Sequence, residues 1–270
     1  MRSTVRKTVL AALLLPAIVG AAQAPRPRPE DTEQWTPEPP PVRPAPPATA
    51  APPSDAIVLF GEGGLGEWVS TGDKSPAKWT AGRGLFTVAK GTGNIETRRR
   101  FGSYQLHLEW RIPPGITGEG QGRGNSGLFL ASTGGGDAGY ELQILDSHAN
   151  KTYANGQAGS VYKQYAPLAN AMRPPGEWQS YDVAWTAPVF AADGSLRTPA
   201  YLTAWHNGVL IQNNVPLAGE TTYVGKPAYK AHGPSPIKLQ DHGDPSRPIS
   251  FRNIWVRELP ANPAPTGAAR

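Results

Sequence analysis

Two pairs of polar residues, each with one residue between its members, could carry out chemistry together. Glu141 and Gln143 form one pair, and Gln240 and His242 form the other. Side chains two residues apart on a strand point to the same face, so each pair would present its polar groups side by side. A carboxylate and an imidazole can transfer protons, and amides can orient a substrate. Such faces can also simply meet solvent on the outside of a sheet.

Further candidates lie where these segments end or turn. Asp146 follows the Glu141 segment with the opposite parity, so it reaches the same face only if the strand ends or bulges there. Arg123 and Asn125 belong to the glycine-rich stretch 118–127, which has neither a Gly-Lys-Ser/Thr signature nor a following helix and is therefore not a phosphate loop. Asp241 adjoins His242, but no His-x-Glu-x-x-His or similar spacing predicts a metal site.

The elements that must position these residues are strands. Segments 104–112 and 140–144 alternate between apolar and polar residues, which is typical of half-buried strands. Segment 201–212 contains an Asn-Gly turn between two apolar runs and predicts a hairpin. Segments 237–242 and 249–258 look like two closing strands. No part of the domain shows sustained helical periodicity, so we predict an all-β sandwich of two antiparallel sheets, a jelly roll.

Tryptophan is abundant in this predicted domain, which must be held by a hydrophobic core because the chain has no cysteine. Most of these rings should be buried, and one or two at a cleft could stack on sugar rings. The tryptophans of the domain are Trp68, Trp79, Trp110, Trp178, Trp185, Trp205 and Trp255.

The net charge of +5 is spread along the chain, and its one basic run is 98–100. A nucleic-acid partner would need a clustered basic stripe, so none is expected.

The first 55 residues predict export and a spacer. Three basic residues precede an apolar run over 8–22, which is too short to span a membrane and ends in Ala22-Gln23-Ala24, a pattern that signal peptidase cleaves. We therefore expect a signal peptide at 1–24, no integral membrane segment after its cleavage, and a periplasmic or extracellular protein. The proline-rich segment 25–55 should be an extended tether, 56–260 one domain, and 261–270 a disordered tail.

Taken in order, the motifs of the domain resemble those of the 3-keto-disaccharide hydrolase family. The match extends from 57 to 259, and segment 187–198 departs from it as extra loop before the hairpin. The matching motifs are the stretches at 124–130, 139–146, 159–162, 175–179, 236–243 and 251–255.

The resemblance implies a concanavalin-like jelly roll with a cleft on its concave sheet and activity on glycosides oxidised to a ketone at C3. The Glu-x-Gln and Gln-Asp-His motifs of the family match Glu141, Gln143, Gln240, Asp241 and His242, which favours a cleft over a solvated face for these positions.

A C3 ketone acidifies the proton at C2, so a base could form the enolate and expel the aglycone from C1, and water could then add. Glu141 and His242 would be base and acid in an order left open, with Asp146 as a second carboxylate. Arg123, Asn125, Gln143 and Gln240 would bind the sugar, and Asp241 would orient His242. A divalent metal could also polarise the ketone.

Two other functions fit the same residues. One is a non-catalytic carbohydrate-binding module, because this fold also hosts lectins. The other is a conventional glycosidase on unoxidised sugars, which would need two carboxylates about 5–10 Å apart. Glu141 with Asp146 or Glu109 is the obvious supply of such a pair. All three hypotheses share a small carbohydrate as the partner.

Overall fold

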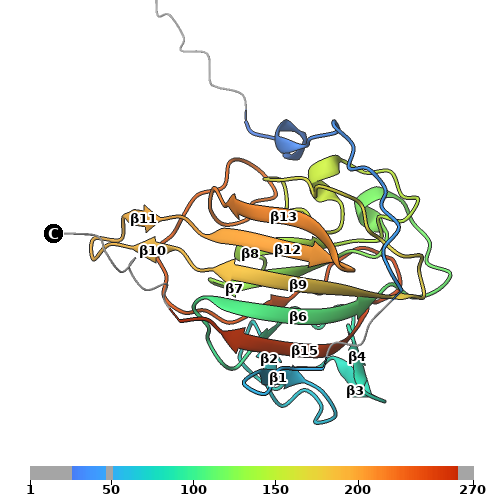
Figure 1. Ribbon diagram of the computed structural model, residues 1–270, viewed down its shortest axis with the longest axis horizontal. Helices are drawn as coiled ribbons and strands as arrows, with labels where there is room; N and C mark the ends of the chain where they lie inside the picture. The colour runs from blue at the N-terminus through green and yellow to red at the C-terminus, as the bar shows by residue number, and fades with distance from the viewer. Residues whose placement is uncertain (1–25, 47–50, 261–270) are drawn as a thin grey trace, which may run out of the picture.

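The strands predicted from the sequence assemble into a sandwich of two antiparallel sheets in the computed structural model, which describes residues 26–46 and 51–260 (Figure 1). Within those residues the helical elements are three short 3-10 turns, η1 (Pro29–Thr32), η2 (Gly120–Gly122) and η3 (Ala154–Gly156). No described helix has the length and apolar character needed to cross a membrane. The predicted signal peptide 1–24 and tail 261–270 lie outside the described residues.

The larger sheet has eight strands in the order β13-β12-β9-β6-β15-β4-β3, with β1 pairing the free end of β15. The alternation over 104–112 becomes β6, which pairs with β9 and β15 along its length. The strands of this sheet are β1 (Ile57–Phe60), β3 (Thr80–Gly82), β4 (Leu85–Thr87), β6 (Tyr104–Arg111), β9 (Trp178–Thr186), β12 (Tyr201–His206), β13 (Val209–Pro216) and β15 (Ser250–Glu258).

The smaller sheet carries the polar pairs and has five strands in the order β2-β5-β14-β7-β8. These are β2 (Trp68–Ser70), β5 (Ile95–Thr97), β14 (Lys238–Leu239), β7 (Ser126–Ser132) and β8 (Gly139–Ile144). The strand predicted over 237–242 is shorter in the structure, because after Gln240 the backbone N of Asp241 donates to the Asn94 side chain rather than to a strand. The extra loop 187–198 forms a hairpin of β10 (Val189–Phe190) and β11 (Leu196–Thr198).

The core between the sheets also fixes the strand that bears Glu141. Tyr181 of β9 and Tyr104 of β6 are completely buried. The Tyr181 hydroxyl crosses the core and donates to the carbonyl of Gln143 on β8 at 2.7 Å, and the Tyr104 hydroxyl donates to the carbonyl of Leu130 on β7 at 2.6 Å. Buried hydroxyls need such partners, so these bonds hold β7 and β8 at a set position on the larger sheet.

The N-terminal segment, residues 26–46, packs along the sandwich (Figure 1). The sequence predicts an extended tether over 25–55, yet Val42 N donates to Asn170 O and Ala154 N donates to Gln34 O. Proline removes backbone donors but leaves carbonyls and neighbouring N–H groups available for such contacts. Residues 26–46 are therefore part of the folded surface.

Candidate functional site

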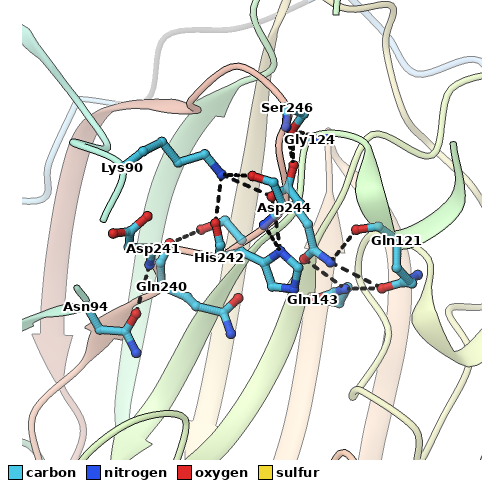
Figure 2. Close-up of polar contacts among 12 residues, drawn as sticks. Lys90, Asn94, Gln121, Gly124, Gln143, Gln240, Asp241, His242, Asp244 and Ser246 are labelled. Atoms are coloured by element: carbon cyan, nitrogen blue, oxygen red, sulfur yellow. Dashed lines mark hydrogen bonds and ion pairs between the residues drawn. The ribbon is translucent and has the colours of Figure 1, made fainter. Parts of the chain in front are cut away.

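A cleft of ≈ 740 Å³ lies over the outward face of the smaller sheet. Both predicted polar pairs reach it, because Glu141 and Gln143 project from β8 while Gln240 and His242 follow β14. Figure 2 shows the amide and imidazole groups of this site and their polar contacts. The cleft is lined by Glu33, Gln121, Gly122, Asn125, Asp137, Glu141, Gln143, Tyr153, Tyr162, Thr221, Tyr223, Gln240, His242, Gly243, Asp244 and Pro245.

The carboxyl group of Glu141 is almost completely shielded from solvent. Its residue is only 6% exposed, and it faces Phe129 across the β7–β8 ladder. A Cβ at Gly127 would come within 2.5 Å of Glu141 Oε1, so this glycine leaves the space that the carboxyl group occupies. Burial raises the pKa of Glu141 to about 8, the charge of Asp137 adds to the rise, and Lys238 opposes it. Glu141 is therefore protonated at neutral pH.

Amide groups cluster beside Glu141. The Gln143 amide nitrogen can donate to Gln121 Oε1 at 3.0 Å and to Asn125 Oδ1 at 3.3 Å. When the Gln143 amide is rotated by half a turn, so that its oxygen and nitrogen exchange places, the nitrogen donates to Glu141 Oε1 at 3.0 Å. Gln240 Oε1 is buried with no hydrogen-bond partner among the described residues. A buried amide oxygen without a partner is costly, so Gln240 is positioned to accept a hydrogen bond from a ligand.

His242 is held by a carboxylate, and that carboxylate is Asp244. His242 Nδ1 lies 3.0 Å from Asp244 Oδ2, which also accepts from Lys90 Nζ at 3.1 Å (Figure 2). Burial raises the pKa of Asp244, but hydrogen bonds from His242, Ser246 and Lys90 outweigh it and lower the pKa to about 2. The expected partner Asp241 is elsewhere, since its Oδ2 accepts from Gly93 N at 2.9 Å.

Arg123 and Asp146, both expected at the site, bind each other instead of lining the cleft. Arg123 Nε donates to Asp146 Oδ2 at 2.8 Å, and Asp146 is completely buried. Asp146 Oδ1 also accepts from His148 N. These contacts hold the loop after β8 against the loop before β7, so the pair stabilises these two loops. The cleft itself receives Glu141, Gln143, Asn125, Gln240 and His242 of the expected residues.

A buried cation beneath the cleft was not foreseen. Lys238 of β14 is completely buried, and its Nζ donates to Gly136 O at 2.9 Å and Ala138 O at 2.7 Å. Burial lowers the pKa of Lys238 to about 8, with Asp137, Glu96 and Glu141 opposing the change. Lys238 thus anchors the loop that carries Asp137 into the cleft. Its position in a strand of otherwise apolar residues was the one available signal.

Tyrosines, and none of the described tryptophans, form the aromatic wall of the cleft. Tyr153 and Tyr162 share a hydrogen bond of 2.6 Å between their hydroxyls. Burial raises the pKa of Tyr162 to about 12, so this hydroxyl stays protonated. The expectation that tryptophan would stack on a sugar is therefore not met at this cleft; large tryptophans such as Trp68 and Trp110 are buried in the core.

The cleft thus combines a protonated carboxyl group, an imidazole backed by an ionised carboxylate, and a group of amides in which Gln240 Oε1 has no partner among the described residues. Such a set can donate one proton, accept another and bind carbonyl or hydroxyl oxygens. The described residues do not bring three His, Cys, Asp or Glu side chains together as a metal site.

A second charged cluster lies on the opposite side of the molecule, on the outer face of the larger sheet. His107 Nδ1 lies 2.7 Å from Asp182 Oδ1, and Glu109 accepts from Arg252 Nε at 2.6 Å. Burial lowers the pKa of His107, but hydrogen bonds to Asp182 and Glu109 outweigh it and raise the pKa to about 9. This cluster belongs to the sheet and lies outside the cleft.

His107→Gln should lower the free energy of unfolding by about 1–2 kcal/mol at pH 6. The folded protein holds the His107 proton more tightly than the unfolded chain, whose pKa is near the model value of 6.5. This stabilisation is therefore complete below about pH 6.5 and is lost as the pH rises through about 9. Urea denaturation of both proteins at pH 6 and pH 10 would measure it, and an equal difference at both values would contradict it.

The sequence model of a family described as the 3-keto-alpha-glucoside-1,2-lyase-like domain matches residues 55–257. No curated protein matches the chain.

Among solved structures, a provisionally assigned glycosyl hydrolase from Parabacteroides distasonis is 47% identical, with a TM-score of 0.74. That match covers 91% of this chain and 100% of the other. Two more provisionally assigned glycosyl hydrolases from the same organism are 20% and 21% identical, each covering 76% of this chain and 94% and 99% of their own, with TM-scores of 0.52. At that identity they show the fold alone.

Proposed function

The chain belongs to the family of 3-keto-alpha-glucoside-1,2-lyase-like domains, and from this premise we propose that it cleaves the glycosidic bond of 3-keto-glycosides. The family and the similar structures support a carbohydrate-active, glycoside hydrolase-like enzyme. The observation that carries the finer proposal is Glu141, a carboxyl group that burial keeps protonated inside the cleft that His242 also lines.

The proposed reaction begins at the C2 proton, which the adjacent C3 ketone acidifies. A base takes this proton and the electrons of the C2–H bond form an enolate. As the C1–C2 double bond forms, the bond from C1 to the aglycone oxygen breaks, and an acid protonates that oxygen. Addition of water across the double bond would then give the free 3-keto sugar. Elimination followed by hydration therefore has the outcome of hydrolysis.

We assign the base to His242 because of its partner. Asp244 stays ionised above a pH of about 2, and its Oδ2 accepts a hydrogen bond from the Nδ1–H group of His242 at 3.0 Å. The backbone N of Asp244 also lies 3.2 Å from Nδ1, but a bond to an ionised carboxylate is the stronger of the two. With Nδ1 carrying the proton, Nε2 is the basic atom available to the substrate.

We assign the acid to Glu141. A pKa of about 8 keeps it protonated at neutral pH, and the pair therefore begins the reaction with one proton to give and one site to receive. The ketone oxygen, which becomes negative, is assigned to amide N–H donors, for which Gln143 and Gln240 are placed in the cleft. All these steps use side chains of the chain itself.

Purified protein should release the aglycone from 3-keto-trehalose and leave trehalose intact. The reason is that the C2 proton of the unoxidised sugar lacks an adjacent carbonyl group, so elimination has no acidic proton to begin from. Chromatography of both reactions, with and without a chelator, measures the selectivity and any dependence on a metal. Release from trehalose would instead support a conventional glycosidase, and binding without release would support a carbohydrate-binding module.

Export remains a proposal based on residues 1–24. Recovery of the protein outside the cytoplasm with an N-terminus at residue 25 would support it, and retention of residues 1–24 would contradict it.

A further inference from the structure

We propose that the N-terminal segment forms one wall of a subsite for the leaving group, in which Glu33 contacts a neutral, hydroxylated ring. This inference rests on the function proposed above and adds a substrate class to it. Its starting observation is that Glu33 lines the same cleft as Glu141 and His242, although it precedes the predicted domain.

The side chain of Asn155, a residue of the domain, binds the backbone of this segment. Asn155 is completely buried. Its Oδ1 accepts from Gln34 N at 2.9 Å, and its Nδ2 donates to Thr32 O at 3.0 Å. These two bonds satisfy both ends of one buried amide with the backbone on either side of Glu33. The segment is therefore bound in one register, which places Glu33 at the cleft.

A buried lysine joins the segment to Tyr223, another residue of the cleft. Lys163 Nζ donates to Pro29 O at 2.7 Å and to Tyr223 O at 3.0 Å. Its Nζ also lies 4.6 Å from the centre of the Tyr223 ring. Since Tyr223 lines the cleft, Lys163 fixes the spacing between Tyr223 and the turn that leads to Glu33.

Glu33 and its neighbours have the chemistry of a sugar-binding wall. Trp35 Nε1 donates to Glu33 Oε2 at 3.3 Å, and the Trp35 ring meets the edge of Tyr153 with centroids 6.0 Å apart. Carboxylate oxygens accept hydrogen bonds from hydroxyl groups, and tyrosine faces pack against the C–H faces of a sugar ring. Asp137 adds a second carboxylate to the same cleft, and like charges repel, so a neutral leaving group is favoured over an anionic one.

Glu33→Gln tests this subsite with two substrates that share the 3-keto ring. 3-keto-trehalose has a glucose leaving group, whereas methyl 3-keto-glucoside has a leaving group too small to reach the wall. The variant should lower the kcat/KM ratio of 3-keto-trehalose to the methyl glycoside by about tenfold, mainly through KM, because the neutral amide oxygen is a weaker acceptor than the carboxylate that it replaces. Trp35→Ala should change the ratio in the same direction.

Glu38→Gln is the matched control, because Glu38 is an exposed carboxylate of the same segment that does not line the cleft. It should leave the ratio at the wild-type value. A wild-type enzyme that cleaves both substrates, with a ratio that Glu33→Gln does not change, would overturn the subsite while the proposed function stands. A wild-type protein that cleaves neither would overturn the proposed function and this inference with it.

Discussion

Glu141→Gln is expected to lower kcat on 3-keto-trehalose by about 10²–10³-fold, with little change in KM. The amide has the size and hydrogen-bonding capacity of the protonated carboxyl group but cannot give a proton to the leaving oxygen. Since the proton moves only in the transition state, the loss should appear in kcat rather than in substrate binding. Steady-state kinetics of the purified variant measures it, and turnover within a few-fold of wild type would refute the assignment of Glu141 as the acid.

The thermal stability of the same variant separates this effect from damage to the fold. The folded protein holds the Glu141 proton more tightly than the unfolded chain, whose pKa is near 4.5. The free energy of unfolding therefore falls as the pH rises from about 4.5 to about 8. A glutamine cannot ionise and avoids this cost. At pH 7 the variant should melt at or above the wild-type Tm while being nearly inactive.

The same pKa predicts a pH limit on catalysis. The wild-type kcat should fall as the pH rises through about 8, because Glu141 then loses the proton that it must donate.

His242→Asn is expected to lower kcat by about 10²–10⁴-fold, because the amide cannot accept the C2 proton. Asp244→Asn tests the same role of His242 by changing which imidazole nitrogen carries the proton. An asparagine can donate to Nδ1 and so place the imidazole proton on Nε2, where it blocks the basic atom. Asp244→Asn should therefore lower kcat substantially although Asp244 takes no proton itself.

The kinetic isotope effect at C2 provides the decisive measurement for this pair. Wild-type protein should turn over more slowly when the substrate carries deuterium at C2, because the base breaks this bond. Asp241→Asn is the matched control, since Asp241 is the adjacent carboxylate that faces Gly93 N. Full activity of His242→Asn with an unchanged isotope effect would show that another group is the base.

The fold could be predicted from the sequence because its strands keep a strict alternation. The pattern over 104–112 and 140–144 places every second residue in the core, and burial confirms this for Tyr104, Leu106 and Leu108. The bounds of β14 could not be predicted, because a side chain distant in sequence, Asn94, takes over the hydrogen bond that would have extended it.

The site could be predicted only for residues whose position in a strand decides the face to which the side chain points. Glu141 and Gln143 reach the cleft because β8 is regular, and Gln240 follows the same rule. Asp244 could not be distinguished from Asp241 as the partner of His242, because both lie in a loop whose path depends on Lys90 and Ser246. Glu33 was missed because its segment has the composition of a spacer, and nothing in the sequence near Asn155 or Lys163 indicates that these residues bind the segment.

The last strand of the domain is also a central strand of the larger sheet, and this affects when the sheet can close during synthesis. β15 lies between β6 and β4 and pairs with β1, the first strand. A growing chain therefore cannot close the larger sheet until residues 250–258 have been synthesised, long after β1 and β6. Contacts this distant in sequence form slowly. Until then the edge of β6 that later pairs with β15 stays unpaired, so the larger sheet should close only when synthesis of the domain is nearly complete.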